Sequence, residues 1–226
     1  MRDLYVKQLQ LGPMKNFVYL VGAQGAKETA IVDPAWDVEA ALAAARADGR
    51  ELTHALISHW HDDHTNGLKP LLELQRTAII CHKADIPRLG AEVRGEAAGV
   101  DGGETIQVGP LGLRALHTPG HTPGSTTWQV AAGASSAPGE AGAIFSGDTL
   151  FVNACGRCDF AGGDPEQMFR SLRRLRELGD DTTLYPGHDY GDVPVSSLGR
   201  EAGHNPYFPL LSDLEKFVAF RMRPRK

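Results

Sequence analysis

Short apolar runs alternate with segments of helical periodicity along the whole chain. Nine runs of four to six mostly apolar residues have the length and composition of buried strands. They are Val18–Gly22, Ala30–Pro34, Ala55–His59, Ala78–His82, Thr105–Val108, Leu113–Thr118, Thr126–Val130, Ala143–Gly147 and Thr183–Pro186. The first twenty residues already alternate as strands do, so the pattern predicts a β-rich chain from its start.

The clearest predicted helix covers Pro165–Leu178, because its apolar residues recur at a 3.6-residue spacing. Asp164 is a favourable N-cap, Pro165 stands at the first helical position, and Gln167 completes a capping-box pattern. Gly179 ends the segment. Further helices are predicted at Val38–Ala47, between Gly67 and Gln75, and near Asp213–Phe220.

The predicted strands form two sets, each with helices attached, which fits two sheets covered by helices on their outer faces. Periodicity alone leaves a doubly wound sheet open as an alternative. Ala131–Gly142 contains only Ala, Gly, Ser, Pro and Glu, and we interpret it as a solvated loop between two strands. The sequence has no internal repeat, and its composition does not change along the chain. We therefore expect residues 1–226 to form one α/β domain with a short helical extension from about residue 200.

Composition limits the classes of function. The chain has 23 basic and 28 acidic residues and a net charge of −5, which argues against a nucleic-acid partner or a membrane surface. Three cysteines cannot form a disulfide framework and suggest a reducing compartment. Because the start lacks the pattern of a secretory leader, we expect a cytoplasmic protein. We expect the basic segment Arg221–Lys226 to be a solvated end.

Histidine is unusually frequent for so few cysteines, with nine copies against three. The segment His59–His64 has the pattern H-x-H-x-D-H and directly follows an apolar strand. Imidazole and carboxylate groups are suitable ligands for zinc and iron. His59 and His61 can therefore share one metal ion, while Asp63 and His64, further round the turn, can face a second ion.

Three more candidate ligands stand in turns that follow apolar strands. His121 lies in a Gly- and Pro-rich turn, Asp148 follows Ser146-Gly147, and His188 follows Pro186-Gly187. Each turn is a weak signal alone. Together, four polar sites that each follow a strand predict one metal centre.

The ordered motifs H-x-H-x-D-H, G-H-T-P-G, S-G-D and P-G-H-D-Y resemble those of the metallo-β-lactamase superfamily, from Asn16 to about Pro206. The resemblance implies an αββα four-layer sandwich with metal ions at one edge, between the two sheets. It assigns His59, His61 and His121 to a first ion, Asp63, His64 and His188 to a second, and Asp148 to a bridging position. Asp63 replaces the cysteine of several antibiotic-hydrolysing members, which argues against that branch.

A hydroxide held between two cations would be the nucleophile at neutral pH, and Asp63 and Asp148 are the candidate catalytic residues. Asp63 can orient the water as well as bind a metal. No separate general acid is evident, which favours a thioester over an amide, because a thiolate with a pKa near ~8.5 leaves readily. The expected activity is therefore that of a metal-dependent thioester hydrolase.

Within the superfamily, Gly147–Phe151 and Cys155–Phe160 resemble the glyoxalase II group, the hydroxyacylglutathione hydrolases, and the related persulfide dioxygenases. The resemblance implies Arg157 and Tyr190 as contacts for a glutathione or other thiol conjugate, since a cation and a phenol suit its carboxylates and amides. It implies two divalent ions, zinc or else iron or manganese. We expect the C-terminal helical domain of full-length glyoxalase II to be missing.

Other functions stay open at this point. Gly156–Phe160 and the segment from Asn205 to Val218 also look like persulfide dioxygenases, which would use one Fe(II) on His59, His121 and Asp148. A lactonase or another hydrolase of the superfamily is a further alternative, and a metal-stabilised binding or sensor protein is a non-enzymatic one. An exposed sheet edge could pair in a homodimer.

We expect the remaining cysteines and histidines to be structural. Cys155 and Cys158 have the spacing of a redox or zinc motif but no second pair, and Cys81 follows an apolar strand. The histidines without a motif partner are His54, His82, His117 and His204.

Overall fold

The structure is a computed structural model, and it describes residues 4–130 and 142–224. Within these residues the strands form two six-stranded sheets and one two-stranded ribbon. The predicted loop at Ala131–Gly142 lies outside the described residues except for Gly142. No helix of the described segments is long and apolar enough to cross a membrane.

The first sheet has the strand order β1-β2-β3-β4-β5-β6. Its members are β1 (Leu4–Leu11), β2 (Asn16–Ala23), β3 (Glu28–Val32), β4 (Glu51–Leu56), β5 (Ala78–His82) and β6 (Ala97–Val100). The first three strands are antiparallel neighbours, and β3 to β6 run parallel. Parallel neighbours need crossover connections. These contain α1 (Val38–Ala47), α2 (Asp62–Thr65), α3 (Leu68–Leu74) and α4 (Ala91–Arg94).

The second sheet has the strand order β14-β13-β10-β9-β8-β7. Its members are β7 (Thr105–Val108), β8 (Leu111–His117), β9 (Thr126–Val130), β10 (Ala143–Phe145), β13 (Thr183–Tyr185) and β14 (Ser196–Ser197). Since β9 is antiparallel to both β8 and β10, and β10 is parallel to β13, the strands β8, β10 and β13 all run in the same direction. The ribbon consists of β11 (Leu150–Phe151) and β12 (Ala154–Cys155).

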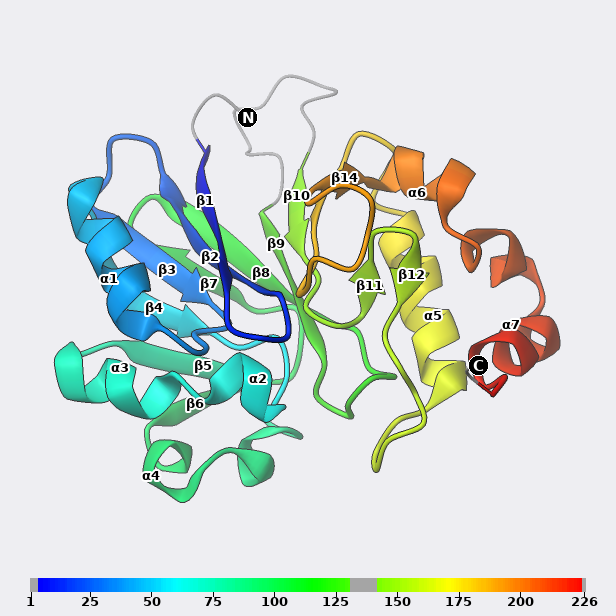
Figure 1. The fold of residues 1–226 in the computed structure, drawn as a ribbon, viewed down its shortest axis with the longest axis horizontal. Coiled ribbons are helices and arrows are strands. Elements are labelled where there is room, and N and C mark those ends of the chain that lie inside the picture. Colours follow the sequence, from blue (N-terminus) through cyan, green and yellow to red (C-terminus); the bar gives the residue numbers. More distant parts are fainter. Residues whose placement is uncertain (1–3, 131–141, 225–226) are drawn as a thin grey trace.

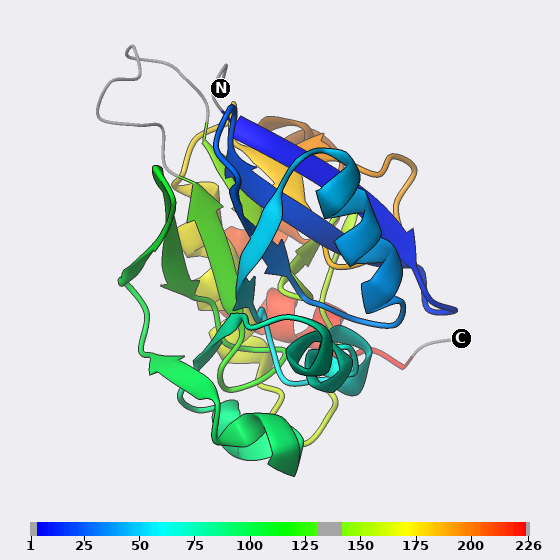
Figure 2. The same cartoon turned by 90° about the vertical axis from the view of Figure 1, so that its left-hand side faces the viewer.

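Helices cover the outer faces of both sheets. In Figure 1, α1 and α3 lie on the side of the first sheet, and the helices α5 (Pro165–Arg176), α6 (Leu198–His204) and α7 (Leu214–Arg221) lie on the side of the second. Figure 2 looks onto the face that α1 covers, with the strands behind it. The layers are therefore helix, sheet, sheet and helix, as the resemblance implies, and the doubly wound alternative is wrong.

Three apolar clusters fill the spaces between these layers. The strand β2 contributes side chains to two of them. Its side chains alternate between the two faces of the first sheet. Val18 and Leu20 pack in the cluster beneath α1 and α3, while Phe17, Tyr19 and Val21 pack in the cluster between the two sheets. The third cluster joins the second sheet to α5, α6 and α7. All residues of β2 are buried, because both of its faces are covered by apolar clusters.

The predicted N-terminal cap of α5 is confirmed, with one difference. The Asp164 carboxylate accepts hydrogen bonds from the backbone N–H groups of Glu166 and Gln167 at 2.8 and 3.0 Å. The Gln167 side chain donates to the Asp164 carboxylate at 2.9 Å. It does not reach the Asp164 N–H, because that group donates to the carbonyl of Gly120 at 2.9 Å. The start of α5 is therefore tied to the loop that carries His121.

Three further features differ from the sequence expectations. β6 was not predicted, because Ala97–Val100 contains two alanines and a glycine in place of bulky apolar residues. α6 was not placed individually, because its two glycines lower the helix propensity. The expectation that Arg221–Lys226 is a solvated end is wrong for Arg221. This side chain is only 7% exposed and donates a hydrogen bond to the Tyr207 hydroxyl at 2.6 Å.

Candidate metal centre

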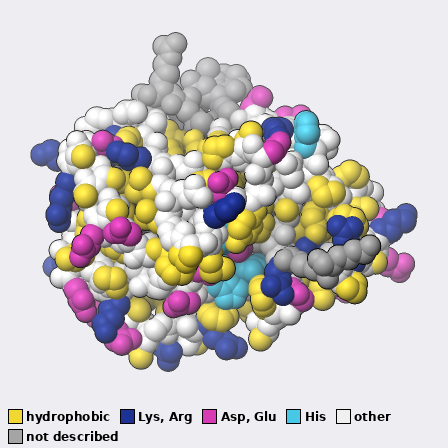
Figure 3. Space-filling view, in the orientation of Figure 1, with side chains coloured by type: hydrophobic (Ala, Val, Ile, Leu, Met, Phe, Trp, Pro, Cys, Tyr) yellow, Lys and Arg dark blue, Asp and Glu magenta, His cyan; other side chains and the backbone are white. Residues whose placement is uncertain are grey.

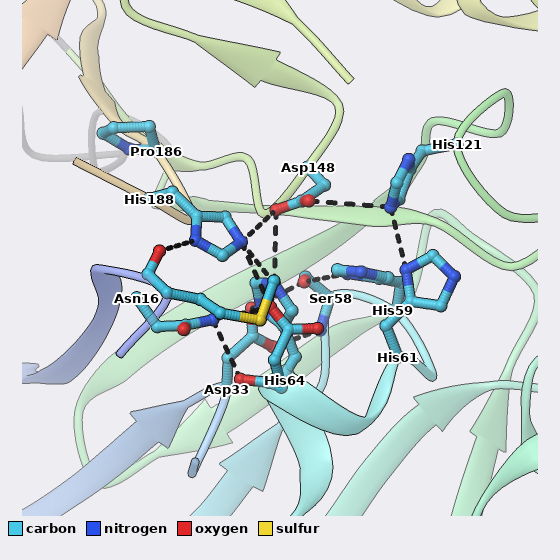
Figure 4. Close-up of polar contacts among 12 residues, drawn as sticks. Asn16, Asp33, Ser58, His59, His61, His64, His121, Asp148, Pro186 and His188 are labelled. Carbon is cyan, nitrogen blue, oxygen red and sulfur yellow. Dashed lines mark hydrogen bonds and ion pairs between the residues drawn. The ribbon is translucent and has the colours of Figure 1, made fainter. Parts of the chain in front are cut away.

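The predicted ligands come together because strands of both sheets end at the same edge of the sandwich. His59 follows β4, His121 follows β8, Asp148 follows β10 and His188 follows β13. The two sheets are joined at this edge by a hydrogen bond of 2.9 Å from the Phe17 N–H, at the start of β2, to the Gly187 carbonyl. Polar turns from distant parts of the sequence thus meet between the sheets (Figure 4).

The first set of possible ligands is His59, His61 and His121, whose ligand atoms all lie within 4.8 Å of one another. The Nε2 atom of His121 lies 2.9 Å from the Nδ1 atom of His61. His59 and His121 are buried, and the Nε2 atom of His59 has no hydrogen-bond partner among the described residues.

The second set is Asp63, His64 and His188, again within 4.8 Å of one another. The Nε2 atoms of His64 and His188 are 3.0 Å apart, and the Asp63 Oδ2 atom lies 3.5 and 3.3 Å from them. Both histidines are buried, while Asp63 is partly open to the cleft.

Asp148 stands between the two sets, as Figure 4 shows. Its Oδ1 atom lies 3.2 Å from His64 Nε2 and 3.4 Å from His188 Nε2. Its Oδ2 atom lies 3.6 Å from His121 Nε2, in the first set. One carboxylate thus offers an oxygen to each set, which is the position expected of a bridging ligand.

The hydrogen bonds around the histidine rings fix which nitrogen can bind a metal. His121 Nδ1–H donates to the Arg157 carbonyl at 2.8 Å, and His188 Nδ1–H donates to the Met14 carbonyl at 3.0 Å. His64 Nδ1 lies 2.9 Å from the Asp33 carboxylate, which can only accept. In the neutral rings Nε2 therefore carries the lone pair that faces the centre. Such hydrogen bonds orient histidines that bind metals.

Asp33 and Ser58 complete this arrangement and were not predicted. Asp33 lies at the end of β3 and accepts hydrogen bonds of 2.6 Å from both the N–H and the hydroxyl group of Ser58. Because the Ser58 hydroxyl donates to Asp33, it must accept from the His59 Nδ1–H, which is 3.0 Å away. This leaves His59 Nε2 with a free lone pair. Asp33 could have been found, since it follows an apolar run as the other predicted ligands do.

A second buried carboxylate, Asp85, ties two of the ligand loops together. It is fully buried and accepts hydrogen bonds from the Trp60 N–H at 3.1 Å, the Thr122 hydroxyl at 2.7 Å and the Gly124 N–H at 2.7 Å. Trp60 lies between His59 and His61, and Thr122 follows His121. Asp85 therefore links the two loops that carry the first set, and no motif indicated it.

The donor set fits divalent metal ions. Burial lowers the pKa of His61 to about 4, with a further contribution from the neighbouring His121. It also lowers the pKa of His59. Both rings are therefore neutral at pH 7, as metal ligation requires. Without an ion, the facing lone pairs of His64 and His188 would repel each other unless one nitrogen held a proton. Nitrogen and oxygen donors without thiolate suit zinc, iron or manganese.

The second set is charged in the metal-free chain. Burial alone would lower the pKa of His188, but the carboxylates of Asp148 and Asp63 outweigh it and raise the value to about 9. Burial alone would raise the pKa of Asp63, but the hydrogen bond from His188 and the charge on His64 lower it to about 2. A metal ion must therefore displace a proton from this set.

The centre opens into a cleft of about 400 Å³. On the face shown in Figure 3, histidine side chains are visible in a hollow with hydrophobic and basic side chains around it. The cleft is lined by Met14, His61, Asp63, His121, Asp148, Phe151, Ala154, Cys155, Arg157, Phe160, His188 and Tyr190. Both predicted substrate contacts, Arg157 and Tyr190, line this cleft.

The Tyr190 and Arg157 side chains both contact other side chains of the protein at the cleft. The Tyr190 ring is stacked on the His188 imidazole, with 4.6 Å between the ring centroids. The Arg157 guanidinium forms hydrogen bonds of 2.8 and 2.7 Å to the two carboxylate oxygens of Asp159 and lies 4.1 Å from the centroid of the Phe160 ring. The Arg157 side chain therefore already has a carboxylate partner at the mouth of the cleft.

The residues expected to be structural lie outside the ligand sets. Cys81, Cys155 and Cys158 are free and buried. The His82 ring is stacked on His117, with 4.1 Å between their centroids. Each of the other two, His54 and His204, forms a hydrogen bond near its own position in the chain.

Two curated relatives cover most of the chain. A probable polyketide biosynthesis zinc-dependent hydrolase from Bacillus subtilis (strain 168) is 30% identical over 209 residues, which is 92% of this chain and 88% of that protein. A hydroxyacylglutathione hydrolase from Synechococcus sp. is 36% identical over 176 residues, which is 77% of this chain and 65% of that enzyme.

Solved structures show the same architecture. ETHE1 from Myxococcus xanthus has a TM-score of 0.83 and 29% sequence identity, and the match covers 98% of this chain and 92% of that one. A protein solved in a di-iron-bound form has a TM-score of 0.72 and 30% identity over 89% of this chain and all of that chain. The family model of the metallo-beta-lactamase superfamily matches residues 11–188. Because this match spans most of the sequence, the protein belongs to the metallo-β-lactamase superfamily.

Proposed function

We propose that this protein is a two-metal hydrolase that cleaves a thioester, with a hydroxyacylglutathione as the favoured substrate. The observation that carries the proposal is the convergence of two ligand sets on Asp148, with one carboxylate oxygen facing each set. Two divalent ions, preferably zinc, would generate a nucleophile from water at neutral pH and would polarise the thioester carbonyl. The first ion would be held by His59, His61 and His121, the second by Asp63, His64 and His188, and Asp148 would bridge them.

The protein's own residues would hold and orient the reactants. Asn16 donates hydrogen bonds to the backbone carbonyl of Asp63 at 2.9 Å and to its carboxylate at 3.0 Å. The carboxylate is therefore fixed where it can orient the attacking water. Water oxygen adds to the carbonyl carbon, the carbon–sulfur bond breaks, and the sulfur leaves with the bonding electron pair. The products are a carboxylate, a thiol that takes up one of the two water protons, and the other proton, which is released. The low basicity of a thiolate makes a dedicated acid unnecessary.

The mouth of the cleft supports a substrate with both apolar and polar parts. Met14, Phe160 and Tyr190 are large hydrophobic side chains that are 46, 39 and 53% exposed and line the cleft. Arg157 contributes the only Lys or Arg side chain among the described lining residues. Exposed apolar side chains beside a buried polar centre are typical of a small-molecule site. A cytoplasmic location and a homodimer remain predictions.

A persulfide dioxygenase is the second candidate, because Gly156–Phe160 and the segment from Asn205 to Val218 resemble enzymes of that kind. A single Fe(II) ion would be held by His59, His121 and Asp148. The two-metal function is favoured because Asp63, His64 and His188 form a second complete ligand set, which a single ion on the first set would leave unused. The relative named as a polyketide biosynthesis hydrolase supports a zinc enzyme and leaves the thiol carrier open.

Metal analysis combined with two activity assays tests this proposal. We expect zinc-loaded protein to release thiol from S-D-lactoylglutathione, and the His188→Ala variant to lose most of this activity. His204→Ala is the matched control, since His204 is exposed and belongs to neither ligand set. No thiol release above background, with two ions bound per chain, would exclude the proposal. Oxygen uptake with glutathione persulfide by protein holding one iron, retained in His188→Ala, would establish the dioxygenase.

A further inference from the structure

Trp36 has an unusual backbone conformation in the loop between β3 and α1. Its φ is +60°, in the left-handed region that a bulky residue rarely adopts. Two hydrogen bonds hold this loop against the end of α2. The Trp36 N–H donates to the Asn66 side-chain oxygen at 2.6 Å, and the Gly67 N–H donates to the Pro34 carbonyl at 3.1 Å. Conformations of this kind are costly and persist where the surrounding contacts determine them, often at functional sites.

The Trp36 ring lies against the turn between β1 and β2. A Cβ atom at Gly12, in this turn, would lie 2.3 Å from the ring, so glycine allows the close approach. From this position the indole Nε1–H donates a hydrogen bond of 2.8 Å to the Asn16 Oδ1 atom. Asn16 is the first residue of β2 and is only 1% exposed. The indole therefore supplies a donor to an oxygen that water hardly reaches.

This hydrogen bond fixes the orientation of the Asn16 amide. A side-chain amide can be turned by half a rotation, which exchanges its oxygen and its NH₂ group, and its neighbours decide between the two orientations. An indole N–H can only donate, so the Asn16 oxygen must face Trp36. The NH₂ group then faces Asp63, and it donates to the backbone carbonyl at 2.9 Å and to the carboxylate at 3.0 Å. Trp36 and Asp63 thus require the same orientation of the amide from its two ends.

The Asp63 carboxylate is the end of this chain of hydrogen bonds and belongs to the second ligand set. Its Oδ2 atom accepts from Asn16 and also lies 3.3 Å from His188 Nε2 and 3.5 Å from His64 Nε2. The position of this oxygen therefore depends on the Asn16 amide. Groups that form hydrogen bonds with metal ligands orient those ligands and strengthen metal binding.

We propose that Trp36 is a positioning residue, whose indole N–H acts through Asn16 to hold the Asp63 carboxylate in place at the second ligand set. This inference rests on the proposed two-metal function, and it adds a residue that is not among the described residues lining the cleft. The Trp36 ring also packs against the apolar cluster beneath α1 and α3. The test must therefore separate the hydrogen bond from the packing of the ring.

The variant Trp36→Phe makes this separation, because it keeps an aromatic ring and removes the N–H donor. We would assign the Asn16 side-chain NH₂ signals by nuclear magnetic resonance in labelled, metal-free protein and measure their hydrogen exchange with solvent. We expect this exchange to be about tenfold faster in Trp36→Phe, because the amide opens more often. Trp128→Phe is the matched control. It removes an indole hydrogen bond of 3.2 Å to the Ile57 carbonyl and should leave exchange at Asn16 unchanged.

A double-mutant cycle on zinc binding tests whether Trp36 acts through Asn16. We would measure the affinity for the second zinc ion by competition with a chelator in wild-type protein, Trp36→Phe, Asn16→Ala and the double variant. We expect each single variant to weaken this affinity about tenfold, and the double variant to bind no more weakly than Asn16→Ala alone. The affinity for the first ion should stay constant, because Asn16 forms no hydrogen bond with His59, His61 or His121.

Two results would overturn the inference. One is an exchange rate at Asn16 that is the same in Trp36→Phe and wild-type protein. The other is a pair of effects that multiply in the double variant and weaken both ions equally, as a role in packing alone predicts. If Asn16→Ala does not fold, the exchange measurement decides the question. Wild-type protein that binds a single zinc ion would contradict the two-metal function, whereas exchange at Asn16 in metal-free protein would still decide the role of Trp36.

Discussion

The Nε2 atoms of His64 and His188 lie 3.0 Å apart at the meeting point of the two sheets. Each ring has its Nδ1 atom engaged, by the Asp33 carboxylate in one case and by the Met14 carbonyl in the other. The two facing nitrogens therefore need a proton or a metal ion between them. Together with Asp63 this pair forms the second ligand set, which is the main physical reason to expect a second metal ion in this protein.

Removal of metal should consequently destabilise the folded chain. An ion that binds only the native state stabilises it by about 2.7 kcal/mol at one hundred times its dissociation constant. We expect treatment with a chelator to lower the temperature of thermal unfolding, and zinc to restore it with release of protons. Calorimetric titration in buffers of different ionisation enthalpy measures that release. An unfolding temperature that does not respond to zinc would contradict this expectation.

Asp33→Asn should weaken metal binding although Asp33 is not assigned as a ligand. The Asp33 carboxylate accepts three hydrogen bonds, two from Ser58 and one from His64. The substitution replaces one carboxylate oxygen by an NH₂ group, which cannot accept a hydrogen bond from the donor that it faces. The tautomers of His59 and His64 are then no longer fixed. Loss of such partners lowers metal affinity roughly 10- to 100-fold. Zinc titration measures it, with Asp62→Asn as control because Asp62 is exposed. Equal zinc affinity in both variants would contradict the assigned role.

Asp85→Ala should loosen the two loops that carry the first ligand set. The substitution leaves buried donors of Trp60, Thr122 and Gly124 without an acceptor. Each unsatisfied buried group costs about 1–3 kcal/mol, so the free energy of unfolding should fall by at least that amount. Chemical denaturation of the zinc-loaded protein measures the loss. A change smaller than about 0.5 kcal/mol, the range of ordinary surface substitutions, would show that these loops do not depend on Asp85.

Gly156→Ala should disturb the position of Asp148. A Cβ atom at Gly156 would lie 1.8 Å from the Asp148 carbonyl oxygen, so the backbone that carries the bridging carboxylate must move. Overpacking of this kind costs about 1–3 kcal/mol, and we expect thiol release to fall tenfold or more. Gly95→Ala is the control, because a Cβ atom there has no neighbour within 4 Å. Activity of Gly156→Ala equal to that of Gly95→Ala would contradict the position assigned to Asp148.

The three cysteines should be unreactive in the folded protein. All are buried, and burial raises the pKa of each thiol, that of Cys158 to about 12. The thiolate is the reactive form. We expect a thiol reagent at pH 8 to modify none of them within the time in which it modifies all three after unfolding. Rapid modification of one cysteine in the folded protein would show an accessible thiolate.

Local patterns in the sequence predicted strands and helices, and the resemblance to the metallo-β-lactamase superfamily supplied the four-layer sandwich with its metal-binding edge. Short apolar runs followed by polar turns indicated strands such as β4 and β10, and the resemblance indicated how the turns meet. Asp85 could not be predicted, since an acid between two ordinary loop residues has no local signal and its role arises from loops far apart in the sequence. The burial of Arg221 was missed for a related reason. A basic segment near the end of a chain is usually solvated, and only the packing of α7 against Tyr207 places this side chain inside.

The most direct test of the two-metal hydrolase is the rate of thiol release from S-D-lactoylglutathione as zinc is added to metal-free protein. The two ligand sets that meet at Asp148 predict that the rate rises until two equivalents of zinc per chain are bound and then stays constant. A rate that is complete at one equivalent, or no thiol release with two equivalents bound, would contradict the account.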